Sequence, residues 1–184
     1  MISVSGLAGL VRERAPRLGA VRLVCVDGPA GSGKTTLAER LAQELGAPVL
    51  HLDDLYEGWA GLDEVFDRLD DQVLGPLAAG RAGRYQRYDW EAGRFAQWRD
   101  VPVPGYLVVE GCGSAPDALA DRAVLVVWVD APAAVRLARG LARDGEHMRG
   151  EWLRWQALEE AHFIRERTRD RAEVAVDGES QLAP

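Results

Sequence analysis

Lysine, asparagine and isoleucine are scarce in this sequence of 184 residues. Asparagine is absent, isoleucine occurs only as Ile2 and Ile164, and Lys34 is the only lysine beside 21 arginines. Such a bias is typical of GC-rich coding DNA and carries no functional information. It does make Lys34 informative, because a chain that uses arginine almost everywhere has kept a lysine at this one position.

Cysteines are also few, and no apolar run is long. Cys25 and Cys112 are too isolated for a disulfide framework or a metal site, and Cys25 lies in an apolar run typical of the core. Met1 to Leu10 lacks the basic start and apolar stretch of a secretory signal. The longest apolar run, Ala123 to Val129, is too short to cross a bilayer. We therefore expect a cytoplasmic protein with no membrane partner.

The net charge and the length of the chain limit which partners and how many domains this protein is expected to have. Lysine and arginine total 22 against 29 acidic residues, and the resulting net charge of −7 argues against a nucleic-acid partner. Hydrophobic residues make up 47% of the chain, which is an ordinary globular balance. A chain of this length suits one domain, so we expect a single domain over residues 1–184, without predicting its oligomeric state.

Apolar strands and amphipathic helices alternate along the chain. The pattern predicts strands at 21–27, 49–52, 106–110, 124–130 and 172–177, and helices at 35–45, 62–79, 132–141 and 152–169. A leading helix is expected within 1–18, a hairpin or irregular segment at 81–103, and a loose tail at 178–184. This alternation predicts an α/β fold with a mostly parallel five-stranded sheet flanked by helices, and a ligand site at the strands' carboxyl ends.

A glycine-rich loop follows the first predicted strand and precedes a predicted helix. Its sequence from Gly28 to Thr35, GPAGSGKT, fits the phosphate-binding pattern G-x-x-x-x-G-K-[ST]. Glycines let such a loop turn its N–H groups inward, while Lys34 would reach the outer phosphates and Thr35 would offer a hydroxyl to Mg²⁺. Common GTPases read their base with Asn-Lys-x-Asp, which a chain without asparagine cannot form. We expect ATP to be bound by Gly28, Ala30, Gly31, Ser32, Gly33, Lys34, Thr35 and Thr36.

Acidic residues end the strands at 49–52 and 106–110. Asp53 follows the first of these, where a carboxylate could orient a hydroxyl acceptor and take its proton; Asp54 is the close alternative. Glu110 ends the second strand and is expected near Mg²⁺, with Asp53 beside it. Farther along, Arg136, Arg139 and Arg143 share one helix face, which would either meet phosphates and adenine or form an exposed basic surface.

Tryptophans fall in two groups. Trp59, Trp90 and Trp98 suit either a flat aromatic pocket or simple packing of the 53–103 segment. Residues 152, 155 and 158 (Trp, Trp, Leu) recur at helical spacing and predict a core-facing side of that helix.

The order of these motifs resembles that of uridine kinase-like P-loop kinases. The resemblance spans residues 20–177 and rests on the phosphate loop, the Asp53-x-Leu55-Tyr56 segment, the Tyr88-Asp89 pair, the strand ending Glu110-Gly111 and the later arginines. It implies that Asp53 is the general base and that Tyr56 and Tyr88 line an acceptor pocket within 53–103, with Asp89 holding substrate hydroxyls.

The same resemblance implies roles for two later elements. Glu110 would assist Mg²⁺, and Arg139 and Arg143 would belong to a small mobile lid at 136–150. The family's histidine shortly after the Tyr-Asp pair is missing in the segment from Tyr88 to Arg94, so the resemblance does not fix the acceptor as uridine.

Together the motifs predict a kinase that uses ATP and Mg²⁺ to phosphorylate a hydroxyl of a small acceptor such as a nucleoside. Two alternatives stay open. A nucleoside monophosphate kinase would need arginines in its acceptor pocket, and Arg94 is a candidate beside residues 81, 84 and 87. A nucleotide-binding regulatory module would bind ATP without transferring phosphate.

Overall fold

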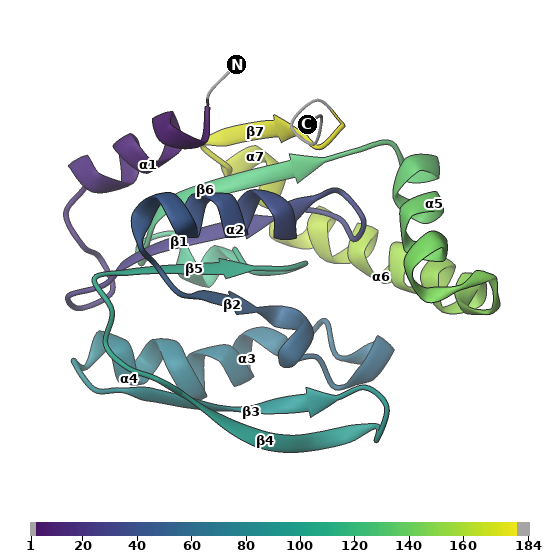
Figure 1. Ribbon diagram of the computed structural model, residues 1–184, viewed down its shortest axis with the longest axis horizontal. Coiled ribbons are helices and arrows are strands. Elements are labelled where there is room, and N and C mark those ends of the chain that lie inside the picture. Colours follow the sequence, from purple (N-terminus) through teal and green to yellow (C-terminus); the bar gives the residue numbers. More distant parts are fainter. Residues whose placement is uncertain (1–2, 180–184) are drawn as a thin grey trace.

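A five-stranded parallel sheet forms the centre of the fold (Figure 1). The computed structural model describes residues 3–179, and the strands lie in the order β2-β5-β1-β6-β7. Every neighbouring pair is parallel, so the carboxyl ends of the strands meet at one edge, and the predicted α/β class is confirmed. The strands are β1 (Arg22–Asp27), β2 (Val49–His51), β5 (Tyr106–Glu110), β6 (Ala123–Asp130) and β7 (Val174–Asp177).

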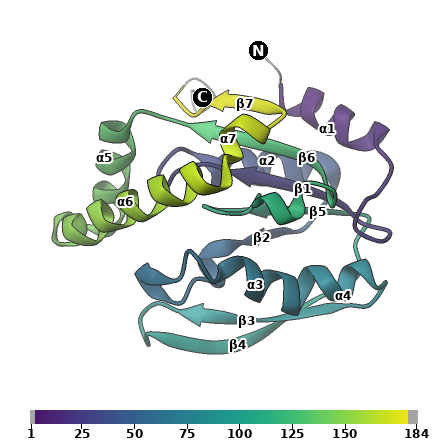
Figure 2. The ribbon, with the colours of Figure 1, turned by 180° about the vertical axis from the view of Figure 1, so that it is seen from behind.

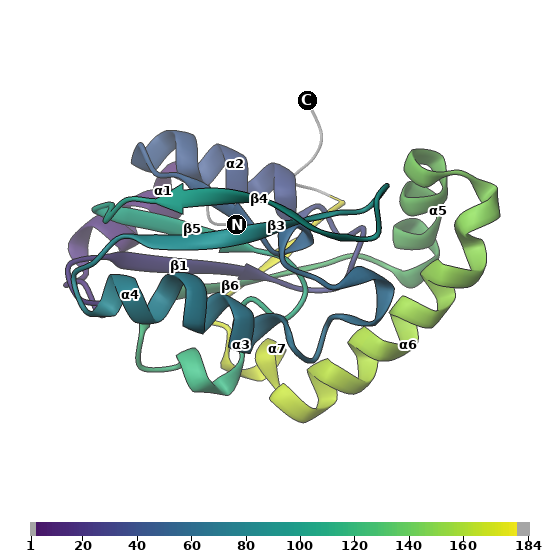
Figure 3. The ribbon, with the colours of Figure 1, turned by 90° about the horizontal axis from the view of Figure 1, so that it is seen from below.

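Helices cover both faces of this sheet (Figure 2). One face carries α1 (Val4–Glu13) and α2 (Lys34–Leu45), and the other carries α3 (Val65–Leu69), α4 (Gly75–Ala78), α6 (Arg149–Glu166) and α7 (Thr168–Arg171). Figure 3 shows α5 (Ala133–Asp144) and the start of α6 beyond the carboxyl ends of the strands. These two elements therefore stand over the edge where a ligand site is expected.

The core is divided between the two faces by the alternation of side chains along each strand. On β1, Leu23 and Cys25 pack toward α3 and α4, whereas Val24 and Val26 pack toward α1 and α2. All four side chains are fully buried, which confirms the core position expected for Cys25. Strands buried on both faces explain the continuous apolar runs in the sequence.

The segment between β2 and β5 forms a separate layer. A π-helical turn (Asp70–Leu74) joins α3 to α4, next to Pro76, which has no N–H to donate into the preceding turn. Short 3₁₀ turns lie at Leu52–Asp54 and Gly58–Ala60. The hairpin of β3 (Gly83–Asp89) and β4 (Arg94–Val101) lies below these helices in Figure 1 and confirms the hairpin expected at 81–103.

Several predicted boundaries differ from the structure. The last long helix spans 149–166 rather than 152–169, because Arg167 adopts a left-handed conformation (φ 53°) that ends it. The leading helix ends at Glu13, and the helix expected at 62–79 begins only at Val65. Residues 180–184 of the expected tail lie outside the described residues. Within residues 3–179 no helix is both long and apolar enough to cross a membrane.

Candidate active site

The phosphate loop forms a tight curve between β1 and α2. Gly28, Gly31 and Gly33 have φ values of 138°, 78° and 101°, which side-chain-bearing residues rarely adopt. Space requires glycine as well, since a Cβ on Gly28 would lie 2.1 Å from the Val129 carbonyl oxygen. The strand-loop-helix context therefore produces the concave backbone that the sequence pattern predicted.

Side chains of the loop fit a polyphosphate. Lys34 is 7% exposed, and its Nζ donates to the Pro29 carbonyl oxygen at 2.9 Å. Burial by itself lowers the pKa of Lys34, but the neighbouring Cys112 sulfur and nearby carboxylates outweigh it, so the net pKa is raised and the ammonium stays charged. The Ser32 hydroxyl is fully buried without a hydrogen-bond partner among residues 3–179, and a phosphate oxygen could accept its hydrogen bond.

Thr35 and Glu110 are the residues best placed to hold Mg²⁺. The Thr35 hydroxyl donates to Glu110 Oε1 at 3.3 Å. In the described part of the chain no cluster of three His, Cys, Asp or Glu side chains could hold a metal by itself. Mg²⁺ commonly takes only one or two protein ligands beside phosphate oxygens and water, so this sparse pair fits a metal that arrives with a nucleotide.

Pairing of β2 with β5 places His51 opposite Glu110. His51 Nδ1 lies 2.7 Å from Glu110 Oε1, and this hydrogen bond, opposed by burial, raises the pKa of His51. The sequence pattern pointed to Glu110 as a site residue but gave no reason to select His51, which lies in a predicted strand. Their contact depends on which strands pair in the sheet, and the sequence pattern does not show this pairing.

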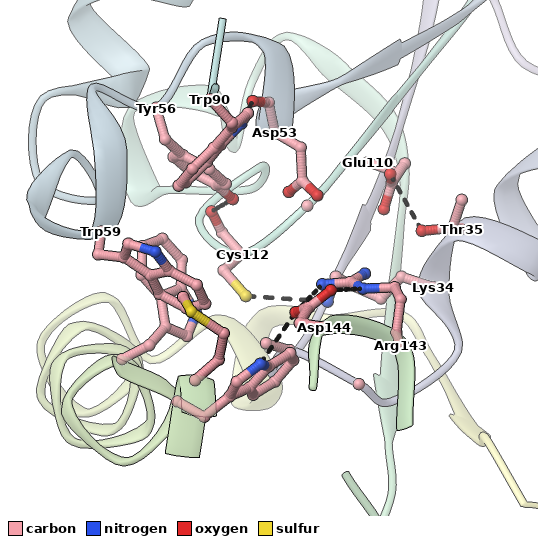
Figure 4. Close-up of a pocket in the computed structure, with 16 residues that line it drawn as sticks. Lys34, Thr35, Asp53, Tyr56, Trp59, Trp90, Glu110, Cys112, Arg143 and Asp144 are labelled. Atoms are coloured by element: carbon pink, nitrogen blue, oxygen red, sulfur yellow. Dashed lines mark hydrogen bonds and ion pairs between the residues drawn. The ribbon is translucent and has the colours of Figure 1, made fainter. Parts of the chain in front are cut away.

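The adjacent acids Asp53 and Asp54 point to different places. Asp53 lines the pocket and faces Lys34 and Arg143 (Figure 4), and burial together with the Glu110 charge raises the pKa of its carboxyl group. Asp54 instead accepts hydrogen bonds from the Tyr85 hydroxyl at 3.1 Å and from Arg87 Nε at 2.8 Å, on the hairpin side. Geometry therefore favours Asp53 over Asp54 as the acid that meets a substrate.

One cavity of about 400 Å³ joins these groups. Eight of the residues expected in the site line it together: Ala30, Gly31, Lys34, Thr35, Asp53, Tyr56, Glu110 and Arg143. The remaining lining residues were not assigned to the site from sequence, although Trp59 and Trp90 had been considered: Trp59, Trp90, Gly111, Cys112, Asp144, Met148, Trp152 and Trp155.

Three expected acceptor residues lie outside this cavity, on the β3–β4 hairpin. Tyr88 is 8% exposed and packs on Trp90 and Phe95. Asp89 Oδ1 accepts the N–H groups of residues 91 and 92, so its carboxylate closes the hairpin turn, and Arg94 pairs with Asp89 across the strands. A second hollow of about 330 Å³ includes Tyr88 and Asp89. Their substrate roles remain predictions.

The two arginines that the resemblance places in a lid lie in different surroundings. Arg143 lines the cavity, paired with Asp144 at 2.7 Å, and its guanidinium carbon lies 5.7 Å from the centre of the Trp152 ring. Arg139 does not line it; its guanidinium donates to the carbonyl oxygens of Gly31 at 3.1 Å and Gly178 at 3.2 Å. Arg139 thus connects α5 to the phosphate loop.

Tryptophans from distant segments form one wall of the cavity. Trp59 lies 5.8–6.1 Å, ring centre to ring centre, from Trp90, Trp152 and Trp155 in edge-to-face contacts. Trp98, by contrast, is 48% exposed. The core prediction for α6 holds for Trp152 and Trp155 but was wrong for residue 158 (Leu), which is 40% exposed. The buried face of α6 continues through Glu159 and His162, and residue 158 lies to one side of that face.

Buried Asp27 connects the phosphate loop to the segment after β5. Its Oδ1 accepts the N–H groups of Gly28 at 2.7 Å and Gly113 at 2.9 Å, and its Oδ2 accepts that of Ala115 at 2.9 Å. Burial raises the pKa of Asp27 to about 6, although these bonds and Lys34 act to lower it. The sequence offered no signal for this role, since Asp27 reads as the last residue of a strand.

Asp27→Ala is expected to lower the free energy of unfolding by about 3 kcal/mol or more, because three buried N–H groups lose their acceptor. Urea denaturation checks this, with Asp71→Ala on an exposed helical position as the matched control. Equal midpoints for Asp27→Ala and Asp71→Ala would contradict the role given to Asp27.

Comparison with known proteins agrees with this geometry. The sequence profile of a family described as an AAA domain matches residues 24–165, which is most of the chain. The chain belongs to this family of P-loop domains. A cytidylate kinase of Natronomonas pharaonis is 34% identical over 123 residues, which cover 66% of this chain. The chain spans little more than half the length of the curated cytidylate kinases that it matches.

Solved structures place this P-loop domain among kinases by fold. A possible uridine kinase from Bacillus stearothermophilus superposes with a TM-score of 0.70 at 22% identity, covering 95% of this chain and 97% of that one. A candidate fructose transport system kinase from Silicibacter sp. TM1040 also gives 0.70, at 20% identity, covering 96% and 98%. At these identities the likeness establishes the fold and leaves the acceptor open.

Proposed function

We propose that the protein is an ATP- and Mg²⁺-dependent phosphotransferase that moves the γ-phosphoryl group to a hydroxyl of a small acceptor. The observation that carries this proposal is the single cavity that joins Lys34 and Thr35 of the phosphate loop to the carboxylate of Asp53. A regulatory module that only binds a nucleotide needs no acceptor pocket beside its phosphate loop. The kinase relatives support the same reading.

Each residue has a defined task in this reaction. Asp53 orients the acceptor hydroxyl and takes its proton, and its raised pKa brings its basicity nearer to neutral pH. Lys34 and Arg143, which lie next to each other in the cavity, neutralise charge on the transferred group. Thr35 and Glu110 would hold Mg²⁺, which when bound would offset the negative charge of the phosphate oxygens.

The cavity supports a hydroxyl acceptor over a nucleoside monophosphate. Among the described residues that line it, Lys34 and Arg143 alone carry positive charge. Both lie at the phosphate-loop side, so a second phosphate on the acceptor would lack the guanidinium partners that it needs. Arg87, one of the arginines considered for that role, is paired with Asp54 outside the cavity.

A nucleoside monophosphate kinase is the second candidate, favoured by the similarity to cytidylate kinases. Release of ADP, measured with nucleosides, sugars and the matching nucleoside monophosphates as acceptors, separates the two. We expect turnover with a neutral hydroxylated compound and none with its monophosphate. Turnover with monophosphates alone would favour the second candidate, and ATP binding without product for any acceptor would favour a regulatory module.

A further inference from the structure

A buried ion pair lies beneath the phosphate loop and takes no part in the proposed transfer step. Arg136 of α5 and Glu159 of α6 meet with Nη1 2.5 Å from Oε1. The Glu159 side chain is 2% exposed and that of Arg136 13%. An ion pair buried this deeply contributes little net stability compared with apolar residues of similar size. Its presence therefore indicates a role other than stabilising the fold.

Both members of the pair bind the same residue of the phosphate loop. Glu159 Oε2 accepts the N–H of Ala30 at 2.7 Å, and Arg136 Nη1 reaches the Ala30 carbonyl oxygen at 3.4 Å. The α5 backbone also touches the loop, because a Cβ on Gly31 would lie 2.6 Å from the Arg136 carbonyl oxygen. The ion pair and the α5 backbone together therefore hold Ala30 and Gly31 in one conformation.

Ala30 and Gly31 line the large cavity together with Lys34, Thr35 and Asp53. Gly33 and Thr36, farther along, line a small separate hollow next to α2. Glu159 and Arg136 therefore hold a part of the loop that lines the cavity shared with Asp53, where the outermost phosphate of a nucleoside triphosphate would lie.

We infer that Glu159, with Arg136, is a positioning residue that holds the Ala30–Gly31 segment in the shape that receives the terminal phosphate. This inference rests on the proposed binding of ATP, but not on phosphoryl transfer. Glu159 acts through the Ala30 N–H and not on substrate. Its helix also carries Trp152 and Trp155 of the cavity wall, so α6 contacts both sides of the site.

The test is a comparison of nucleoside triphosphate and diphosphate affinities by calorimetry in the presence of Mg²⁺. The probes are the β,γ-imido analogue of ATP, which carries the terminal phosphate, and ADP, which lacks it. The main variant is Arg136→Met/Glu159→Met, since an apolar pair of similar size preserves the fold while Ala30 loses its acceptor. Glu160→Gln, at the exposed neighbouring position of α6, is the matched control.

We expect the double variant to bind the ATP analogue about ten-fold or more weakly, the loss typical of one hydrogen bond to a charged group, with ADP affinity changed far less. Glu159→Gln, which keeps one acceptor oxygen for Ala30, should fall between the wild type and the double variant. Glu160→Gln should match the wild type with both nucleotides.

A double variant that unfolds at the wild-type urea concentration and keeps the wild-type ratio of the two affinities would overturn the inference. Equal weakening of both nucleotides would also overturn it, because it indicates a general disturbance of the loop. Wild-type protein that binds both nucleotides but phosphorylates no acceptor would refute the proposed function alone and leave this test intact.

Discussion

Lys34→Ala is expected to lower the rate of phosphoryl transfer at least about 100-fold, the typical effect of removing one preorganised donor to developing charge. Lys34 is almost fully buried at the cavity wall, and the neighbouring Cys112 sulfur and carboxylates raise its pKa, so its ammonium group stays charged. No other lysine exists to replace it. Steady-state kinetics together with calorimetry of the β,γ-imido analogue of ATP would measure the loss in both rate and affinity.

Lys34→Arg tests whether the shape of the lysine side chain matters in addition to its positive charge. The site around Nζ is closed by the Pro29 carbonyl oxygen at 2.9 Å and by Cys112 Sγ at 3.8 Å, so a planar guanidinium does not fit without moving the loop. We expect Lys34→Arg to remain strongly impaired although it keeps the charge. If Lys34→Ala had wild-type kinetics, the phosphate loop would take no part in the reaction.

Asp53→Asn is expected to reduce the transfer rate by about 10²–10⁴-fold while ADP affinity stays nearly unchanged, because general-base assistance contributes about that much. The amide keeps the size of the side chain but cannot accept the acceptor's proton. Rapid-quench measurement of a single turnover reports the transfer step itself, free of product release.

Asp54→Asn is the matched control, since its carboxylate binds Tyr85 and Arg87 away from the cavity and its loss should leave the transfer rate near that of the wild type. The pH profile adds an independent check. Asp53 must be ionised to act, and its pKa is raised, so the rate should fall as pH drops through a value above 3.8. Equal rates for Asp53→Asn and the wild type would show that Asp53 is not the base.

Local sequence was sufficient for the phosphate loop. Its glycines, Lys34 and Thr35 act within one strand-loop-helix unit, whose shape depends on neighbours in the chain. The five-stranded parallel sheet followed from the alternation of apolar strands and helices, so the edge bearing Asp53 and Glu110 could be expected in advance.

Contacts that depend on strand order or helix packing could not be predicted in the same way. His51 meets Glu110 only because β2 pairs with β5 in a particular register. Trp152 and Trp155 had the helical spacing of core residues, which they are, but the core face of α6 at this end is also the wall of the cavity.

The hairpin shows a different limit. Tyr88 and Asp89 matched a motif of the uridine kinase-like family, yet an aspartate ahead of a tight turn also accepts backbone N–H groups, as Asp89 does. A lone cysteine in the sequence does not indicate a role in a site, so Cys112 was not selected. In the structure its sulfur donates to the Gly28 carbonyl oxygen at 3.3 Å, next to Lys34.

Phosphorus NMR of the product tests the central claim most directly. With ATP, Mg²⁺ and an acceptor that supports ADP release, the account predicts a new resonance from a phosphate monoester on a hydroxyl oxygen. The wild type and Asp54→Asn should form it at similar rates, and Asp53→Asn at least about 100-fold more slowly. A new phosphoanhydride resonance beside those of ATP and ADP, from transfer to an acceptor phosphate, would contradict it.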